Sequence, residues 1–183
     1  MWNDFNDSKS QQSFEVIPHG TVAKVRMTIK PGGYDDEASG WSGGYATRNE
    51  DTGSIYLSCE FVVLEGEYSK RKIWSLIGLH SPKGPEWSNI GRSFIRAILN
   101  SARGISESDD SKKAQDARRI NAIADLDGIE FIARIDVVKD QHGYDRNEIR
   151  FAITPDHKDY AKIAATQNQK PSSSNSNPPL WAS

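Results

Sequence analysis

The feature that most constrains this 183-residue chain is an alternation of apolar and polar residues that recurs in five separate segments. Successive side chains of a β-strand point to opposite faces of a sheet, so the alternation predicts strands with one buried and one wet face. We place the strands at residues 23–30, 55–64, 71–78, 129–139 and 146–154. The clearest is residues 55–64, where one face carries only apolar side chains: Ile55, Leu57, Cys59, Phe61 and Val63.

Between the third and fourth strands the apolar spacing changes to three and four residues, which is typical of one face of an α-helix. Five residues carry this spacing: Trp87, Ile90, Phe94, Ile95 and Ile98. Pro85 suits the start of this helix and Gly104 its end. We expect a second helix at residues 111–124, with Lys112, Lys113, Arg118 and Arg119 on its wet side, and a last short helix at residues 154–165.

The element order β-β-β-α-β-β predicts the fold class. The fold is mainly β with helices, and the order is that of an OB-fold-like five-stranded barrel with a helix between strands 3 and 4. Alternation on every strand fits a small barrel with a filled interior. An open antiparallel sheet packed on one helix has the same order and remains an alternative.

Both ends of the chain differ from the strand-rich part. Residues 1–13 have no periodicity and are expected to be flexible, which leaves residues 14–163 as one domain. Residues 164–183 are rich in Ser, Asn and Pro, a composition too polar to form a core, so we expect disorder. Leu180 and Trp181 form an apolar pair there that could dock another protein.

The sequence also indicates a compartment. Cys59 is the only cysteine, so no disulfide can form within the chain. No run approaches the roughly 18 apolar residues of a membrane span, and the polar, acidic opening is unlike a secretory signal. We therefore expect a cytoplasmic protein with no membrane partner.

Charges are segregated along the chain although the net charge is only −2. Residues 31–67 contain eight acidic residues and one basic residue, whereas residues 69–103 contain seven basic residues and one acidic residue. Such a basic block can form a surface that attracts a phosphate backbone. A solvated face whose charges find partners elsewhere in the fold is the alternative.

The OB-like geometry predicts a binding surface on strands 2 and 3, between the loops at residues 31–54 and 140–145. Single-stranded nucleic acid needs cations for its phosphates and flat rings for its bases. Nine residues qualify: Lys24, Arg26, Trp41, Tyr45, Tyr56, Arg71, Lys72, Trp74 and Tyr144. Trp74 could instead belong to a second core beneath a tail, and Tyr56 could be cross-strand packing. We expect Trp87 to pack the helix against the barrel.

Motifs of enzymes are weak in this chain. It has no phosphate-binding P-loop motif and no nucleophile elbow, and its four histidines lack metal-ligand spacing. We expect no enzyme activity, no metal and no cofactor. The remaining enzymatic alternative is a Mg²⁺-dependent nuclease that uses neighbouring carboxylates, such as Asp125 with Asp127, or Asp136 and Asp140 with Lys139.

One stretch, residues 60–74, resembles a family of phage and prophage proteins of unknown function, together with the opening at residues 16–21 and the helix entrance at residues 90–92. The similarity covers roughly residues 14–98, and its clearest matches lie in one turn: Glu65, Gly66, Tyr68, Arg71 and Lys72. Members of this family resemble phage single-stranded-DNA-binding proteins encoded beside replication and recombination genes. This tail departs from bacterial single-strand binders because its end has a tryptophan but no acidic residues.

Together these features predict a non-enzymatic single-stranded-DNA-binding protein of phage or prophage origin that acts in replication or recombination. Binding should be weakly sequence-selective and strongly salt-dependent, because it releases counterions. Through Leu180 and Trp181, the tail could recruit a replication or recombination protein of the host or the phage. The alternative is a protein-interaction adaptor that uses the tail and the aromatic loop. RNA in place of DNA, and homo-oligomerisation, stay open.

Overall fold

The structure, a computed structural model, describes residues 3–4, 6 and 15–165. Its long strands are β1 (Thr21–Lys30), β4 (Ile55–Val63), β5 (Lys72–His80), β6 (Glu130–Lys139) and β7 (Asp145–Ala152). Two further strands, β2 (Tyr34–Asp36) and β3 (Trp41–Arg48), flank the 3-10 helix η1 (Glu37–Ser39). The other helices are α1 (Glu86–Arg103), α2 (Lys112–Ala117), the 3-10 helix η2 (Ile123–Leu126) and α3 (Tyr160–Ala165).

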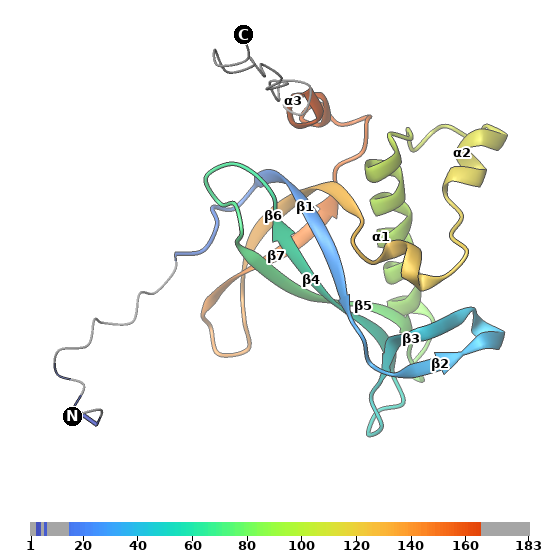
Figure 1. Cartoon of the computed structure of the whole chain (residues 1–183), viewed down its shortest axis with the longest axis horizontal. Helices are drawn as coiled ribbons and strands as arrows, with labels where there is room; N and C mark the ends of the chain where they lie inside the picture. Colours follow the sequence, from blue (N-terminus) through green and yellow to red (C-terminus); the bar gives the residue numbers. More distant parts are fainter. Residues whose placement is uncertain (1–2, 5, 7–14, 166–183) are drawn as a thin grey trace, which may run out of the picture.

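The five long strands form one antiparallel sheet in the order β5-β4-β1-β6-β7. The sheet curls into a half-barrel that brings β5 beside β7, without a hydrogen-bonded ladder between them in the described residues (Figure 1). Each long strand lies within a few residues of its predicted position. The mainly β fold and the helix between the third and fourth long strands are confirmed.

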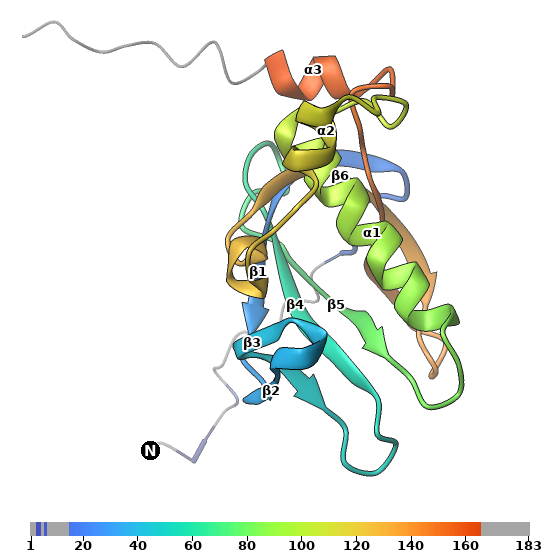
Figure 2. The ribbon, with the colours of Figure 1, turned by 90° about the vertical axis from the view of Figure 1, so that its right-hand side faces the viewer.

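Helix α1 covers the open end of the half-barrel and completes its core (Figure 2). Phe94 of α1 meets Phe61 and Phe131, with ring centroids 6.0 to 6.4 Å apart for the three pairs. Full burial of such a side chain contributes about 1.5–3 kcal/mol, so this cluster fixes the helix on the sheet. The expected apolar face is wrong at Ile90, which is 61% exposed.

Gly91 takes the place beside the sheet that Ile90 does not occupy. A Cβ atom at Gly91 would lie 2.0 Å from the carbonyl oxygen of Gly78 in β5. A Cβ atom at Gly78 would lie 2.4 Å from the ring of Trp87. Two glycines therefore let α1 cross β5 in direct contact, and the expectation that Trp87 packs the helix on the sheet is confirmed.

The expected long loop at residues 31–54 is wrong, because most of it is the β2–β3 hairpin. Strand β3 pairs with β4 through Thr47 and Arg48. It occupies the part of the β4 edge that lies beyond the end of β1 at Lys30. Glycine and polar residues lie among Trp41, Tyr45 and Ala46 in residues 41–48, so no regular alternation marks them as a strand. The hairpin is held locally, since the Asp35 carboxylate accepts a hydrogen bond from the Gly44 backbone N–H.

The expected helix at residues 111–124 is shorter than predicted, and it ends at Ala117. Arg118 was expected on the solvent-facing side of this helix, and that expectation is wrong. Its guanidinium donates hydrogen bonds to the Asn100 side chain and to two backbone carbonyls. The bond to Asn100 ties this segment to α1, and the other two tie it to the loop at residues 106–109. The last helix spans only Tyr160–Ala165.

Two expectations for the chain ends fall mostly outside the described residues. These are the flexible segment at residues 1–13 and the tail with Leu180 and Trp181. Within the described part of the chain, every helix is too short or too polar to cross a membrane.

Candidate nucleic-acid interface

The convex surface of β5, β4 and β1 carries three rows of side chains that cross the sheet. The strand register sets them side by side, since Val62, Glu60 and Ser58 of β4 each have a partner on both neighbouring strands. The rows are Lys72–Val62–Arg26, Trp74–Glu60–Thr28 and Leu76–Ser58–Lys30. We call these nine residues the outer face; each row is about 10 Å wide, because neighbouring strands lie about 4.8 Å apart.

Two large apolar side chains of the outer face are open to solvent. Trp74 is 62% exposed and Leu76 is 52% exposed. They alternate with Ile73 and Ile77, which are buried in the core. The register therefore holds Trp74 on the outside, and no second core covers it in the described part of the chain.

The cations of the outer face are balanced by carboxylates from neighbouring strands. Lys72 Nζ lies 3.2 Å from Glu60 Oε1. Glu130 of β6 holds both Arg26, at 2.6 Å, and Lys24, at 3.2 Å. The hydrogen bond from Arg26, with the charges of Arg26 and Lys24, lowers the Glu130 pKa against a smaller effect of burial. The exposed Lys30 has no ion-pair partner among the described residues.

Arg71 and Lys72 lie where the turn at residues 64–71 enters β5. Lys70 adopts a positive φ of 70° in this turn. The Arg71 guanidinium donates to the backbone carbonyl of Glu15, so it fastens the segment before β1 to the turn. Arg71 thus has a structural contact, whereas Lys72 points from the strand onto the outer face.

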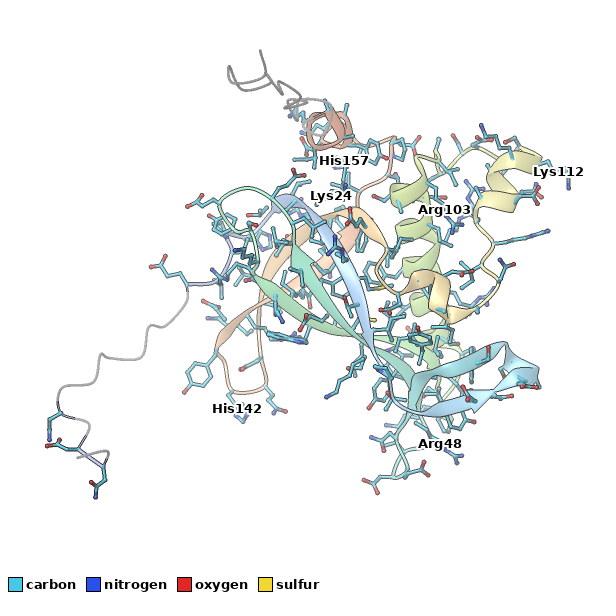
Figure 3. All side chains as sticks on the ribbon, in the orientation of Figure 1. Lys24, Arg48, Arg103, Lys112, His142 and His157 are labelled. Carbon is cyan, nitrogen blue, oxygen red and sulfur yellow. The ribbon has the colours of Figure 1, made fainter. Side chains whose placement is uncertain are left out.

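Tyr144 stands on the turn between β6 and β7 and is 72% exposed. The Asp140 carboxylate shapes this turn by accepting the backbone N–H groups of His142 and Tyr144. This turn and the β2–β3 hairpin project on either side of β4 and β5 (Figure 1). Figure 3 shows His142 at the tip of the turn, on the opposite side of the molecule from Lys112 of α2.

The remaining predicted site residues are partly covered. The Tyr56 ring packs against Trp87, with centroids 6.2 Å apart. Trp41 and Tyr45 are partly buried against the core, although their sequence context offered no packing partner. The structure thus brings Arg26, Lys72 and Trp74 together on one surface and leaves Tyr56, Trp41 and Tyr45 outside it.

Sequence reasoning left out six of the nine members of the outer face: Thr28, Lys30, Ser58, Glu60, Val62 and Leu76. Leu76, Thr28 and Lys30 were not among the predicted site residues, yet the same alternation places them beside Trp74 and Arg26. Extending the alternation along each strand would have found them. The two carboxylates carried no such signal, because only the strand pairing brings them to the cations.

The carboxylates considered for a nuclease site hold the fold together. Asp136 is 7% exposed and accepts hydrogen bonds from the Arg134 side chain and the Gly20 backbone. Asp127 accepts the backbone N–H of Ile29, and Lys139 pairs with Asp145 at 2.7 Å. Within the described residues, no group of three or more His, Cys, Asp or Glu is placed to hold a metal ion.

Comparison of the sequence with protein-family models and with curated proteins finds no match.

Proposed function

We propose that this protein binds single-stranded DNA on its outer face and performs no chemistry on it. The observation that carries the proposal is the row Trp74–Glu60–Thr28, flanked by a row that ends in Lys72 and Arg26. It offers an exposed indole ring, 62% open, on β5 beside Lys72 of the same strand, with Arg26 and Lys30 on β1 across β4. An unpaired strand presents the complementary groups, which are flat bases and regularly spaced phosphates.

The sheet order supports the same proposal. A curled five-stranded antiparallel sheet with a helix between its third and fourth long strands fits the OB-fold class. Proteins of that class bind oligonucleotides on strands 2 and 3, between the loops after strands 1 and 4. In this chain those elements are β4 and β5, the β2–β3 hairpin and the β6–β7 turn. The resemblance to phage and prophage proteins adds a cytoplasmic role in replication or recombination to the proposal.

The chemistry of the outer face predicts moderate affinity. Stacking of one base on Trp74 contributes about 1–3 kcal/mol and does not select a sequence. Three cations, Lys30, Lys72 and Arg26, can meet phosphates, which gives a slope of about −2 in a plot of log K against log salt. Glu60 and Glu130 oppose the phosphates, so the affinity should fall below that of an uncompensated basic surface.

Fluorescence anisotropy with a labelled oligo(dT) of about 30 nucleotides tests the proposal. Trp74→Ala should weaken binding about fivefold to 100-fold, as expected for the loss of one stacked base. Lys72→Ala should weaken it less and reduce the salt slope by about 0.7. Lys112→Ala, on the exposed and distant α2, is the matched control and should bind like the wild type.

Two results would contradict the proposal. One is a wild-type protein that does not bind the oligonucleotide at low salt. The other is binding that is unchanged in both Trp74→Ala and Lys72→Ala. An oligo(rU) of equal length measures the preference for DNA over RNA, and shortening of the oligonucleotide in Mg²⁺ would favour the nuclease alternative.

A further inference from the structure

A cavity of about 760 Å³ lies between α1, the β2–β3 hairpin and the segment at residues 118–126. These elements lie on the same side of the sheet in Figure 1. The floor of the cavity is aliphatic: Leu79, Ile95 and Ile120 are partly exposed, and the buried Leu57, Leu99 and Leu126 also line it. The volume is in the range of sites that take a small ligand or a few side chains.

The cavity faces away from the outer face. Leu57 and Leu79 line it, and on β4 and β5 they alternate with residues that point to the convex side. Leu57 is fully buried, whereas Trp74 is mostly exposed on the outer face. A ligand in the cavity and a nucleic acid on the outer face would therefore contact opposite sides of the sheet.

The rim of the cavity is basic. Arg92, Arg96 and Arg118 line it, and no acidic residue does. Arg118 is already fastened by its three hydrogen bonds to the chain. Arg92 and Arg96 are exposed, lie one turn apart on α1, and have no ion-pair or hydrogen-bond partner among the described residues. Side chains four residues apart on a helix are neighbours, so the two guanidinium groups can act on one ligand.

We propose that this cavity docks an acidic peptide segment of another protein, with an aliphatic side chain of the peptide on the aliphatic floor. Guanidinium groups bind carboxylates through paired N–H donors, which suits Arg92 and Arg96. The floor favours a peptide over a nucleobase, because a base needs a flat ring surface and Trp41 is the only aromatic residue among those that line the cavity. The protein would thus carry a partner while its outer face holds DNA.

Fluorescence anisotropy of the full chain with the labelled peptide Asp-Glu-Leu-Leu-Glu-Asp tests the proposal. Arg92→Glu with Arg96→Glu should weaken binding at least about tenfold, because two attractive charge contacts become repulsive. Lys112→Glu with Lys113→Glu makes the same charge change on exposed residues of α2 outside the cavity, and should leave binding within about twofold of the wild type. Peptides with serines for the leucines, or with amides for the acids, should each bind more weakly.

Three outcomes overturn this inference. The first is no binding of the peptide by the wild type at about 1 mM. The second is equal binding by the Arg92→Glu, Arg96→Glu variant. The third is displacement of the peptide by oligo(dT) together with loss of oligo(dT) binding in that variant, which would assign the cavity to nucleic acid. Trp74→Ala should retain the peptide, so a failure of the DNA proposal and a failure of this one are distinguishable.

Discussion

Replacing Glu60 by Gln should strengthen DNA binding, although the change removes an ion pair that is visible in the structure. Lys72 Nζ lies 3.2 Å from Glu60 Oε1. A phosphate oxygen that binds the same ammonium group from the opposite side would lie at most about 6 Å from the carboxylate, given the 3.2 Å contact and a second N–O distance near 2.9 Å. The phosphate and the carboxylate repel each other at that distance. Removing the carboxylate charge removes this repulsion and frees Lys72.

The size of the effect follows from Coulomb's law. At about 6 Å the repulsion is about 0.7 kcal/mol in water and about 2.8 kcal/mol at an effective dielectric constant of 20. Screening at 0.1 M salt reduces these values by roughly half. The Glu60→Gln variant should therefore bind oligo(dT) about twofold to tenfold more tightly. The gain should shrink as the salt concentration rises.

The assay is anisotropy titration of oligo(dT) at two salt concentrations, with urea unfolding as a check on the fold. The stability of the variant should stay within about 1 kcal/mol of the wild type, because an ion pair this exposed contributes little. Glu86→Gln, at the exposed start of α1, is the matched control for the loss of one negative charge. Unchanged or weaker binding by Glu60→Gln would refute the assignment of Lys72 as a phosphate contact.

Three further predictions concern the folded body. Gly91→Ala should lower the free energy of unfolding in urea titration by about 1–3 kcal/mol or more, because the added Cβ would meet the Gly78 carbonyl. Ser93→Ala, at an exposed position of the same helix, is the control and should leave the free energy of unfolding unchanged. Asp136→Asn should cost about 1–3 kcal/mol at pH 7 by losing hydrogen bonds of a buried carboxylate. Burial raises the Asp136 pKa, but the hydrogen bonds and charges of its neighbours outweigh burial, so the pKa is lowered overall. The difference in free energy of unfolding between wild type and Asp136→Asn should therefore fade as the pH drops through that lowered pKa. Burial, with a smaller effect of a nearby carboxylate, raises the pKa of the Cys59 thiol to about 12, so the thiol should react with a disulfide reagent only after unfolding.

The long strands were predictable because their two faces meet different surroundings. Residues 55–64 were expected as a strand, and β4 spans Ile55–Val63 with every second residue buried. The helix over the barrel end was predictable for the same reason, since its apolar spacing faces the core. The predicted apolar face of this helix was wrong at Ile90, because the helix comes closest to the sheet at Gly91, and a glycine carries no hydrophobic signal.

The hairpin β2–β3 was not predictable from local pattern. Residues 41–48 have glycines and polar groups on both faces, and their strand exists because β4 offers a free edge once β1 departs. That edge depends on pairing between distant parts of the chain. The same holds for Arg118, whose guanidinium meets Asn100 only after the segment folds back on α1.

The candidate site was only partly predictable, because some of its contacts also depend on strand pairing. Alternation along β5 places Lys72 and Trp74 on the outside, and that much follows from the strand itself. The carboxylates that balance the cations come from neighbouring strands, and Glu130 is 104 residues from Arg26 in sequence. Local charge counting therefore overstated the positive potential of this surface.

The basic block at residues 69–103 is the clearest case of a linear pattern that folding divides. Lys72 lies on the outer face, whereas Arg92 and Arg96 lie at the cavity on the other side of the sheet. Arg103 is turned to the backbone carbonyls of Ala117 and Arg119. A phosphate backbone on the outer face would thus meet only a small share of the charge that the sequence concentrates there. Two modest basic surfaces on opposite sides of one sheet fit two ligands better than they fit a single long one.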